Sequence, residues 1–332
     1  MGIKIGNINA NTSVKLGTTT IQSGYIGTDL IFGNQIIKIL DAYGSAHHAY
    51  SLRKLGSVYN GACLRVRRTT ASPNLITTTT ADVEFDSNGT ISFSSPISNK
   101  TGNATNAINL GEFAIGAVDG LTAQSVINVV TWYDQSGNSK NPTNATVTQQ
   151  PRLVRLDSGV ATLETSGGKA AVRFIRTSST RLRIADTSAD INNLSSYFVG
   201  AYAAFSTNTQ NVYSLSTTNR WYLPASTSGG VYAGYDNDAF AIFLNTMNTD
   251  RKLYELISPS PSSNSFIIAY SNGVVVGDAL IQSGPISSID IGAAGGLNPY
   301  DGFIQEIITY QSNANRLQKE RNINSYWQIY GL

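Results

Sequence analysis

The sequence predicts an all-β fold, an antiparallel jelly-roll sandwich with a small N-terminal β module and one C-terminal helix. Many short runs alternate apolar and polar residues, as half-buried strands do. The chain also holds 30 glycines and 17 tyrosines, which suits tight turns and strands respectively. Helical spacing of apolar residues is rare and is clearest near the C-terminus. About a dozen short strands with almost no helix favour a sandwich.

The first 38 residues differ from the rest and predict a separate module. Residues 14–21 and 25–32 each place a glycine after an apolar residue and continue through a short polar turn. This pattern predicts a pair of small β-hairpins. Such a module buries little apolar surface, so we expect it to anchor the chain to a partner or to copies of itself. The alternative is that it is the first hairpin of the main domain, residues 39–332.

The main domain is predicted to open with a helix over residues 46–55. Ala49, Leu52 and Leu55 have helical spacing, and Gly56 follows as a stop. Residues 63–67 then alternate as a strand. Arginines at positions 65, 67 and 68 are interpreted as part of one solvated strand face. Residues 86–89, Asp-Ser-Asn-Gly, have the chemistry of a turn.

Short strands follow along the rest of the chain. Asn272-Gly273 predicts the tight turn of a hairpin. The expected strands are residues 126–133, 150–154, 167–174, 181–184, 196–202, 211–215, 221–223, 231–235, 266–270, 274–277 and 303–310.

The chain is predicted to end in an amphipathic helix. Asn315 and Gln318 form a plausible capping pair at its start. Apolar residues then fall on roughly one face of this helix. These residues are Leu317, Ile323, Trp327 and Tyr330.

Composition and charge exclude several classes of partner. Only 13% of residues are charged and the net charge is +2, so nucleic acid is not an expected partner. The single cysteine, Cys63, allows no intrachain disulfide and suggests synthesis in a reducing cytoplasm. No apolar run approaches the ~20 residues that cross a bilayer, and no secretory leader is evident. An uncharged polar surface without an export signal predicts release by lysis or a place in a virus particle.

The stretch VVTWYDQSGNSK, residues 129–140, ends a predicted strand at an acidic turn. Asp134 after two aromatic residues could line a catalytic cleft. Its carboxylate can equally accept the backbone N–H of Ser136, and Gly137 can supply a positive φ. We interpret Asp134, Ser136 and Gly137 as a structural turn.

No metal or cofactor site is predicted. His47 and His48 are the only histidines, and adjacent residues on a helix cannot bind one ion as an i, i+4 pair does. Asp82, Glu84 and Asp86 alternate along a strand and do not form an oxygen cage for calcium. No Gly-x-Ser-x-Gly elbow accompanies the histidines, so a serine hydrolase triad is not indicated.

Four blocks in sequence order carry a resemblance to a known family. They are residues 49–55 with 64–68, VVTWYDQSGN with QPRLV (129–138 and 150–154), GGKAAVRF (167–174), and residues 303–310 with the terminal helix. Together these blocks resemble the laminin-G-like, concanavalin-type jelly roll of the arabinofuranosidase B catalytic domain, over about residues 40–332. Tailed-phage virion proteins of no known enzymatic activity resemble the same domain.

The resemblance implies where a catalytic pair would lie. Retaining glycosidases use two carboxyl groups about 5 Å apart. The family's nucleophile lies in an Asp-x-Glu, whose nearest counterpart is Asp236-Asn237-Asp238, so Asp236 and Asp238 are weak candidates. The family's acid/base follows a Gly-Gly pair, whereas here Leu297 follows and cannot donate a proton. The family's cysteine pair is also missing. We therefore expect no hydrolysis and assign no catalytic residue.

Aromatic residues supply the candidate glycan contacts. Trp221 and Tyr222 adjoin a Gly-Ser-Thr-rich loop, and Tyr235 follows. The sequence thus predicts a homo-oligomeric bacteriophage virion protein: a capsid decoration, head fibre or tail-associated protein. Residues 1–38 would bind other virion proteins, and the jelly roll would bind a host-surface glycan weakly, with strength gained through many copies. The alternative is a glycoside hydrolase of arabinofuranosidase type.

Overall fold

The computed structural model divides the chain into two compact units, Met1–Ile37 and Lys38–Leu332. It describes the strands within residues 14–33 and residues 37–331, apart from residues 71–78, 187–193, 204–209, 216–221, 228–229, 236–238, 241–248, 258–264, 282–286 and 294–296.

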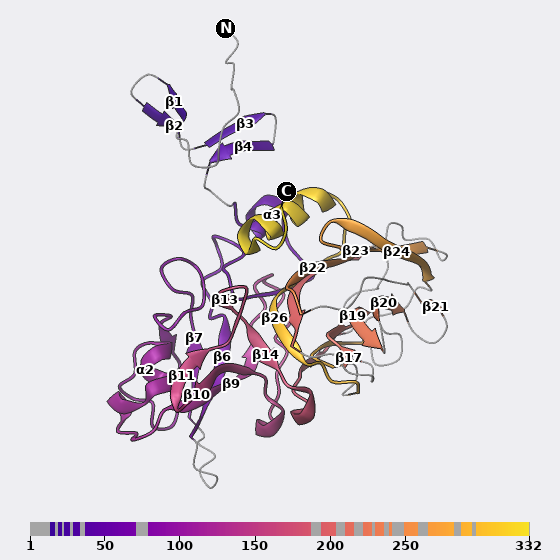
Figure 1. Ribbon diagram of the computed structural model, residues 1–332. Helices are drawn as coiled ribbons and strands as arrows, with labels where there is room; N and C mark the ends of the chain where they lie inside the picture. The colour runs from indigo at the N-terminus through magenta and orange to yellow at the C-terminus, as the bar shows by residue number, and fades with distance from the viewer. Residues whose placement is uncertain are drawn as a thin grey trace. The chain divides into compact units, whose positions relative to one another are not determined.

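The first unit consists of two antiparallel hairpins (Figure 1). β1 (Val14–Leu16) pairs with β2 (Thr19–Ile21), and β3 (Ser23–Ile26) pairs with β4 (Asp29–Gly33). In each hairpin, two residues that start with glycine separate the strands. The pair of hairpins predicted from the repeated pattern is therefore confirmed, while its anchoring role stays a prediction.

The second unit is built on a large antiparallel sheet. Within the described residues this sheet has 13 strands, with β16 and β26 near its middle. Along one edge, β26 pairs with β14 and then with β5 (His48–Ser51). β11 (Val160–Leu163) pairs with β10. The main path runs through β24 (Val274–Ile281), β23 (Ser265–Ser271), β22 (Lys252–Ile257), β16 (Ser195–Tyr202), β26 (Gly302–Tyr310), β14 (Val172–Phe174), β10 (Arg152–Asp157), β9 (Ser125–Trp132), β6 (Leu64–Thr70), β7 (Thr80–Val83) and β8 (Ile97–Ser98).

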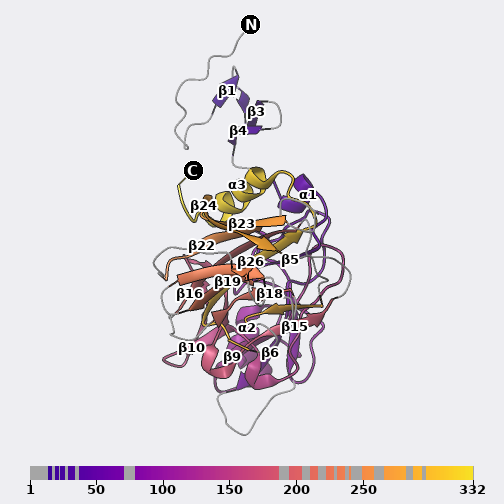
Figure 2. The ribbon, with the colours of Figure 1, turned by 90° about the vertical axis from the view of Figure 1, so that its right-hand side faces the viewer.

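A smaller sheet completes the sandwich. β19 contacts β22 and β21 contacts β24, so the two sheets face each other across a shared core (Figures 1 and 2). The all-β sandwich predicted from the sequence is confirmed. The smaller sheet contains β15 (Leu182–Ala185), β25 (Ser288–Ile291), β18 (Tyr213–Ser214), β19 (Tyr222–Thr227), β20 (Gly230–Tyr235), β21 (Ala239–Phe240) and β17 (Gln210–Asn211); β12 (Thr165–Ser166) and β13 (Lys169–Ala170) form a separate pair.

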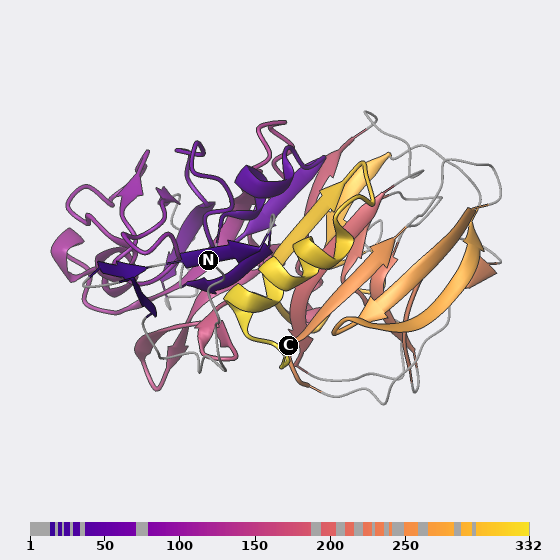
Figure 3. The same ribbon diagram turned by 90° about the horizontal axis from the view of Figure 1, so that it is seen from above.

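Helices are short in the described residues. Asn109 caps α2 by accepting the Glu112 N–H at 2.8 Å, and Gly116 ends it with φ 75°. The C-terminal helix lies across the outer side of the large sheet (Figure 3). The helices are α1 (Ile39–Tyr43), α2 (Leu110–Ile115) and α3 (Arg316–Trp327), with 3-10 turns η1 (Ala117–Asp119), η2 (Val147–Gln149) and η3 (Arg176–Ser178).

The predicted helix over residues 46–55 is wrong, because its centre is strand β5. All four residues of β5 are buried. A strand buried on both faces shows no alternation in sequence, so apolar spacing alone cannot separate it from a helix. Ala49 pairs with Ile308 and Tyr50 with Ile307 of β26.

The terminal helix and Arg68 also differ from the sequence prediction. Asn315 precedes α3 with φ 57° and makes no side-chain cap, and Leu317 is 52% exposed although Ile323 and Trp327 are buried. Arg68 is not solvated: its side chain is fully buried and pairs with Asp119 at 2.8 Å.

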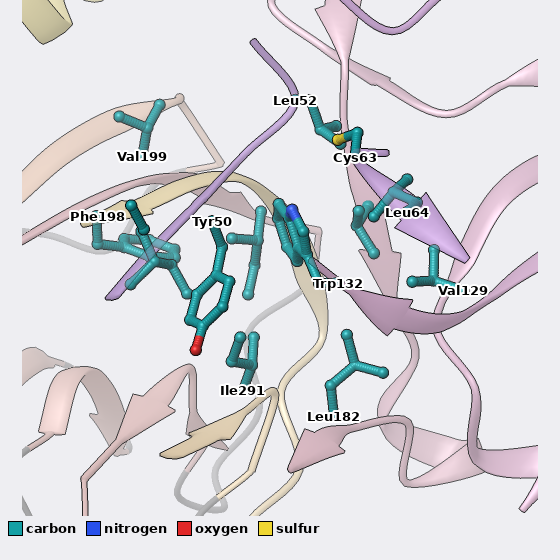
Figure 4. Close-up of a cluster of buried hydrophobic side chains, with 14 of the residues drawn as sticks. Tyr50, Leu52, Cys63, Leu64, Val129, Trp132, Leu182, Phe198, Val199 and Ile291 are labelled. Carbon is teal, nitrogen blue, oxygen red and sulfur yellow. The ribbon is translucent and has the colours of Figure 1, made fainter. Parts of the chain in front are cut away.

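One apolar cluster lies between the sheets (Figure 4). Tyr50 of β5 and Trp132 of β9 contact each other there, with ring centroids 6.2 Å apart. Cys63 is free and buried in the same cluster, and its thiol donates to the Ser51 carbonyl at 3.2 Å. The core therefore joins strands from both halves of the unit.

Candidate functional site

In the sequence, the predicted glycan and catalytic candidates fall within or next to the segments that form β19 and β20. Trp221, Asp236 and Asp238 fall outside the described residues. Tyr222 begins β19 and Tyr235 ends β20, and Tyr222 pairs with Gly234, the neighbour of Tyr235. The backbones of these two tyrosines therefore lie side by side at one end of the hairpin.

The segment that would carry an acid/base by resemblance offers no free carboxyl group among its described residues. Leu297 is 59% exposed at the surface. Asp301, farther along, pairs with Arg173 at 2.7 Å, and its backbone N–H donates to Gln210. An apolar side chain and an ion-paired carboxylate are not the pair that retaining hydrolysis needs.

Asp134 forms a buried Asx turn at the end of β9. Its Oδ1 accepts the N–H groups of Ser136 (2.9 Å) and Ala49 (2.8 Å), and its Oδ2 accepts the Ser136 hydroxyl (2.7 Å) and the Lys140 N–H (3.1 Å). Gly137 follows with φ 91°. Burial raises the pKa of Asp134, and these hydrogen bonds oppose the rise.

The neighbouring Gln135 holds the open edge of β5. Its Oε1 accepts the Leu55 N–H at 2.8 Å, and its Nε2 donates to the carbonyls of Ser51 (2.9 Å) and Arg53 (3.0 Å). Its backbone N–H donates to the Ala49 carbonyl at 2.8 Å. The Asp-Gln pair thus supplies the hydrogen bonds that a neighbouring strand would give to β5.

A chain of polar side chains crosses the core between the sheets. His47 lies just before β5 and His48 begins it, while Tyr213 belongs to the smaller sheet. We call the side chains of Asp186, His47, His48, Tyr213, Thr309 and Ser196 the histidine chain. Its contacts are Asp186 Oδ2–His47 Nε2 (3.5 Å), His47 Nδ1–His48 Nδ1 (2.8 Å), His48 Nε2–Tyr213 OH (2.5 Å), Tyr213 OH–Thr309 Oγ1 (3.0 Å) and Thr309 Oγ1–Ser196 Oγ (2.9 Å).

The histidine chain keeps both imidazoles neutral at pH 7. Burial lowers the pKa of His47 to about 4; the charge of Lys140 adds to this and Asp186 opposes it. Burial also lowers the pKa of His48 well below its usual value, and His47 contributes. Burial raises the pKa of Tyr213. These perturbed groups can pass protons along hydrogen bonds, but their side chains are buried from solvent.

No pattern in the sequence indicates this chain, because the predicted helix over residues 46–55 excludes a joint role for the two histidines. In the structure they bond to each other from a strand and from the residue before it. Among the described residues, no three His, Cys, Asp or Glu side chains gather as metal ligands. No helix in that part of the chain is long and apolar enough to cross a membrane.

A second buried cluster places two carboxyl groups around one guanidinium. Nη2 of Arg316 lies 3.3 Å from Glu255 Oε1 and 2.8 Å from Glu320 Oε2. Burial raises the pKa of Glu255 to about 8; Arg316 opposes this and Glu320 adds to it. Tyr330 donates its hydroxyl to Glu320. The side chain of Glu255 is fully buried, so this pair fastens α3 to β22 rather than facing a substrate.

Comparison with known proteins identifies the fold. No protein-family model matches this chain, and no curated protein matches it in sequence. The solved structures that it is similar to include an arabinofuranosidase complexed with arabinofuranosyl-α-1,2-xylobiose, at a TM-score of 0.53 and 15% identity. A GH54 α-L-arabinofuranosidase soaked with a cyclic sulfate inhibitor gives a TM-score of 0.56 at 15% identity. Each match covers 88% of this chain and 65% of the other, and shows a shared sandwich fold.

Proposed function

We propose that this protein is a carbohydrate-binding β-sandwich protein without hydrolytic activity, carried on a bacteriophage particle. Residues 1–38 would anchor it to other virion proteins as a homo-oligomer, and the sandwich would face outward as a capsid decoration, head fibre or tail-associated protein. The fold similarity to arabinofuranosidases supports the carbohydrate part. The low charged fraction of 13% supports the virion part.

The observation that carries the non-hydrolytic part is that Asp134, Glu306 and Asp301 are each held by hydrogen bonds or an ion pair. Asp134 accepts four hydrogen bonds, and Glu306 receives two bonds from the Arg53 guanidinium, at 2.7 and 3.0 Å. Asp301 pairs with Arg173. A carboxylate held in this way serves structure, because attack on a sugar or proton transfer to it would break buried bonds.

Binding and hydrolysis can be measured on the same sample. We expect calorimetric titration with arabinofuranosyl-α-1,2-xylobiose to show weak binding, with no release of 4-nitrophenol from 4-nitrophenyl α-L-arabinofuranoside. Trp221→Ala, Tyr222→Ala and Tyr235→Ala should each weaken binding about tenfold or more, as loss of a stacked ring does. Tyr59→Ala, in the loop before β6, is the control. Binding unchanged in all three variants would contradict the assignment of these residues as glycan contacts.

A glycoside hydrolase of arabinofuranosidase type is the second candidate, favoured by the TM-score of 0.56 to such an enzyme. In that case 4-nitrophenol release would be measurable, and Asp236→Asn or Asp238→Asn would abolish it. Turnover that survives both substitutions would exclude this assignment of the nucleophile.

The particle location is tested by mass spectrometry of purified phage from the source material. The proposal expects peptides of this chain at tens of copies per particle. Their absence from intact particles would refute the virion location and leave carbohydrate binding to be judged by titration.

A further inference from the structure

The histidine chain joins the two sheets of the sandwich. Ser196 lies on β16, Thr309 on β26 and His48 on β5, all in the large sheet. Tyr213 lies on β18 of the smaller sheet and receives contacts from both His48 and Thr309. Asp186 follows β15 of the smaller sheet and contacts His47. Both links therefore run from one sheet to the other.

Each of the four hydrogen bonds from His47 to Ser196 needs one donor and one acceptor, while Asp186 acts on His47 through its charge at 3.5 Å. Asp186 pairs with Lys140 at 2.7 Å, so its carboxylate only accepts. It therefore favours a proton on Nε2 of His47, and in the neutral ring this leaves Nδ1 bare. Nδ1 of His48, 2.8 Å away, must then carry the proton between the two rings.

Donors and acceptors are fixed in the same way at the Ser196 end of the chain. A neutral His48 with a proton on Nδ1 has a bare Nε2, which accepts the Tyr213 hydroxyl at 2.5 Å. The Tyr213 oxygen accepts from Thr309 at 3.0 Å, and Thr309 accepts from Ser196 at 2.9 Å. Each of these donors finds an acceptor, and the hydrogen bonds all point in the same direction from Ser196 to His47.

We propose that these side chains form a one-way hydrogen-bonded latch between the sheets, in which His48 is the Nδ1–H tautomer and His47 the Nε2–H tautomer, and that the pair accepts one added proton but not two. One added proton can be placed on Nε2 of His48 if the hydroxyls of Tyr213, Thr309 and Ser196 reverse. A second would put two N–H groups face to face across the 2.8 Å Nδ1–Nδ1 contact. That contact must then break, so acid opens the latch.

The surrounding charges set the pH at which the latch opens. Asp186 favours protonation of both rings, whereas Lys140 and burial oppose it. Tyr50 stacks on His48 at 5.4 Å, and Asp134 accepts the N–H of the next residue, Ala49. Because both folded-state pKa values are lowered, the stability from the neutral pair is complete above pH 6.5 and is lost as pH falls toward about 4.

Nitrogen-15 NMR of the full chain tests the tautomers directly, because the protein has only two histidines. At pH 7 we expect two neutral rings of opposite tautomer, and His47→Gln identifies which signals belong to His48. Two rings of the same tautomer, or a charged ring at pH 7, would overturn the proposal. During acid titration, at most one ring should become charged while the near-UV circular dichroism stays native. Two charged rings in the native protein would also overturn it.

Tyr213→Phe tests whether the chain extends to the smaller sheet. It should shift the ring nitrogen signals of His48, because it removes their hydroxyl donor. Tyr310→Phe is the matched control, since Tyr310 is buried next to Thr309 and its hydroxyl has no hydrogen-bond partner within the described part of the chain. Equal shifts in both variants would show that the chain stops before Tyr213.

Discussion

Single buried polar residues fix much of this structure. Asp134 and Gln135, in a turn far along the chain, bind the backbone of β5 and of the residues that follow it, up to Leu55. Their side chains supply hydrogen-bond partners to buried backbone donors and acceptors of this segment. At this scale the sequence was informative for Asp134, because an Asx turn depends on residues two positions away. It was silent for Gln135, whose partners are distant in sequence.

Loss of the Gln135 amide should therefore be costly. Gln135→Ala leaves the Leu55 N–H and two carbonyl contacts unmet, so we expect the free energy of unfolding to fall by about 3 kcal/mol. Urea denaturation measures it. Gln318→Ala, exposed on α3, is the control and should change stability by less than about 0.5 kcal/mol. Equal effects would mean that the amide contacts contribute little.

Glu255 should give the protein a stability that falls as pH rises. Burial raises its folded pKa to about 8, above the ordinary value of 4.5, so the folded state holds the proton more tightly. This contribution is complete below pH 4.5 and is lost as pH rises through about 8, at up to about 1.4 kcal/mol per pH unit. Glu255→Gln should flatten the dependence in this window, measured by urea denaturation at several pH values. Asp278→Asn, at an exposed carboxyl group, should leave it unchanged.

At the scale of elements, α3 depends on a few residues of one face. Trp327 is buried and Leu317 is 52% exposed, although helical spacing placed both on one face. Trp327→Ala should lower the free energy of unfolding by about 3–5 kcal/mol through lost packing. Leu317→Ala should lower it by less than about 0.5 kcal/mol. Thermal or urea unfolding of the two variants distinguishes them, and a large effect at Leu317 would restore the face predicted from spacing.

Strands and turns with one face in solvent could be predicted from the sequence. The prediction failed for elements that are buried on both faces. The Asn272-Gly273 hairpin has both residues at positive φ, as its chemistry predicts. Apolar spacing predicts a helix at β5 because this strand is buried throughout and its second edge is closed by side chains rather than by a strand. The sequence predicts a solvated Arg68 because its partner Asp119 lies in a distant 3-10 turn.

At the scale of the whole molecule, composition and turn chemistry were enough for the sandwich but not for its interior. The histidine chain draws six side chains from both sheets, and their spacing along the sequence carries no pattern. Local sequence reports turns and exposed faces, whereas a buried network depends on which strands the topology brings together. The sequence therefore predicts the candidate site only as aromatic and acidic residues within or next to the segments that form β19 and β20.

We expect the sandwich to fold without the hairpin module, because the two are separate compact units. Lys38 precedes α1, and its carbonyl accepts the N–H groups of Asp41 and Ala42, so the deletion should stop at residue 36. In the first unit, β1 pairs with β2 and β3 pairs with β4. We expect the truncated protein to keep the melting temperature of the sandwich and, under the proposed anchoring role, to be missing from purified particles. Calorimetry and particle mass spectrometry separate the two claims: a melting temperature lowered by more than about 5 °C would show that the module stabilises the sandwich. Normal incorporation of the truncated chain would instead refute anchoring through this segment.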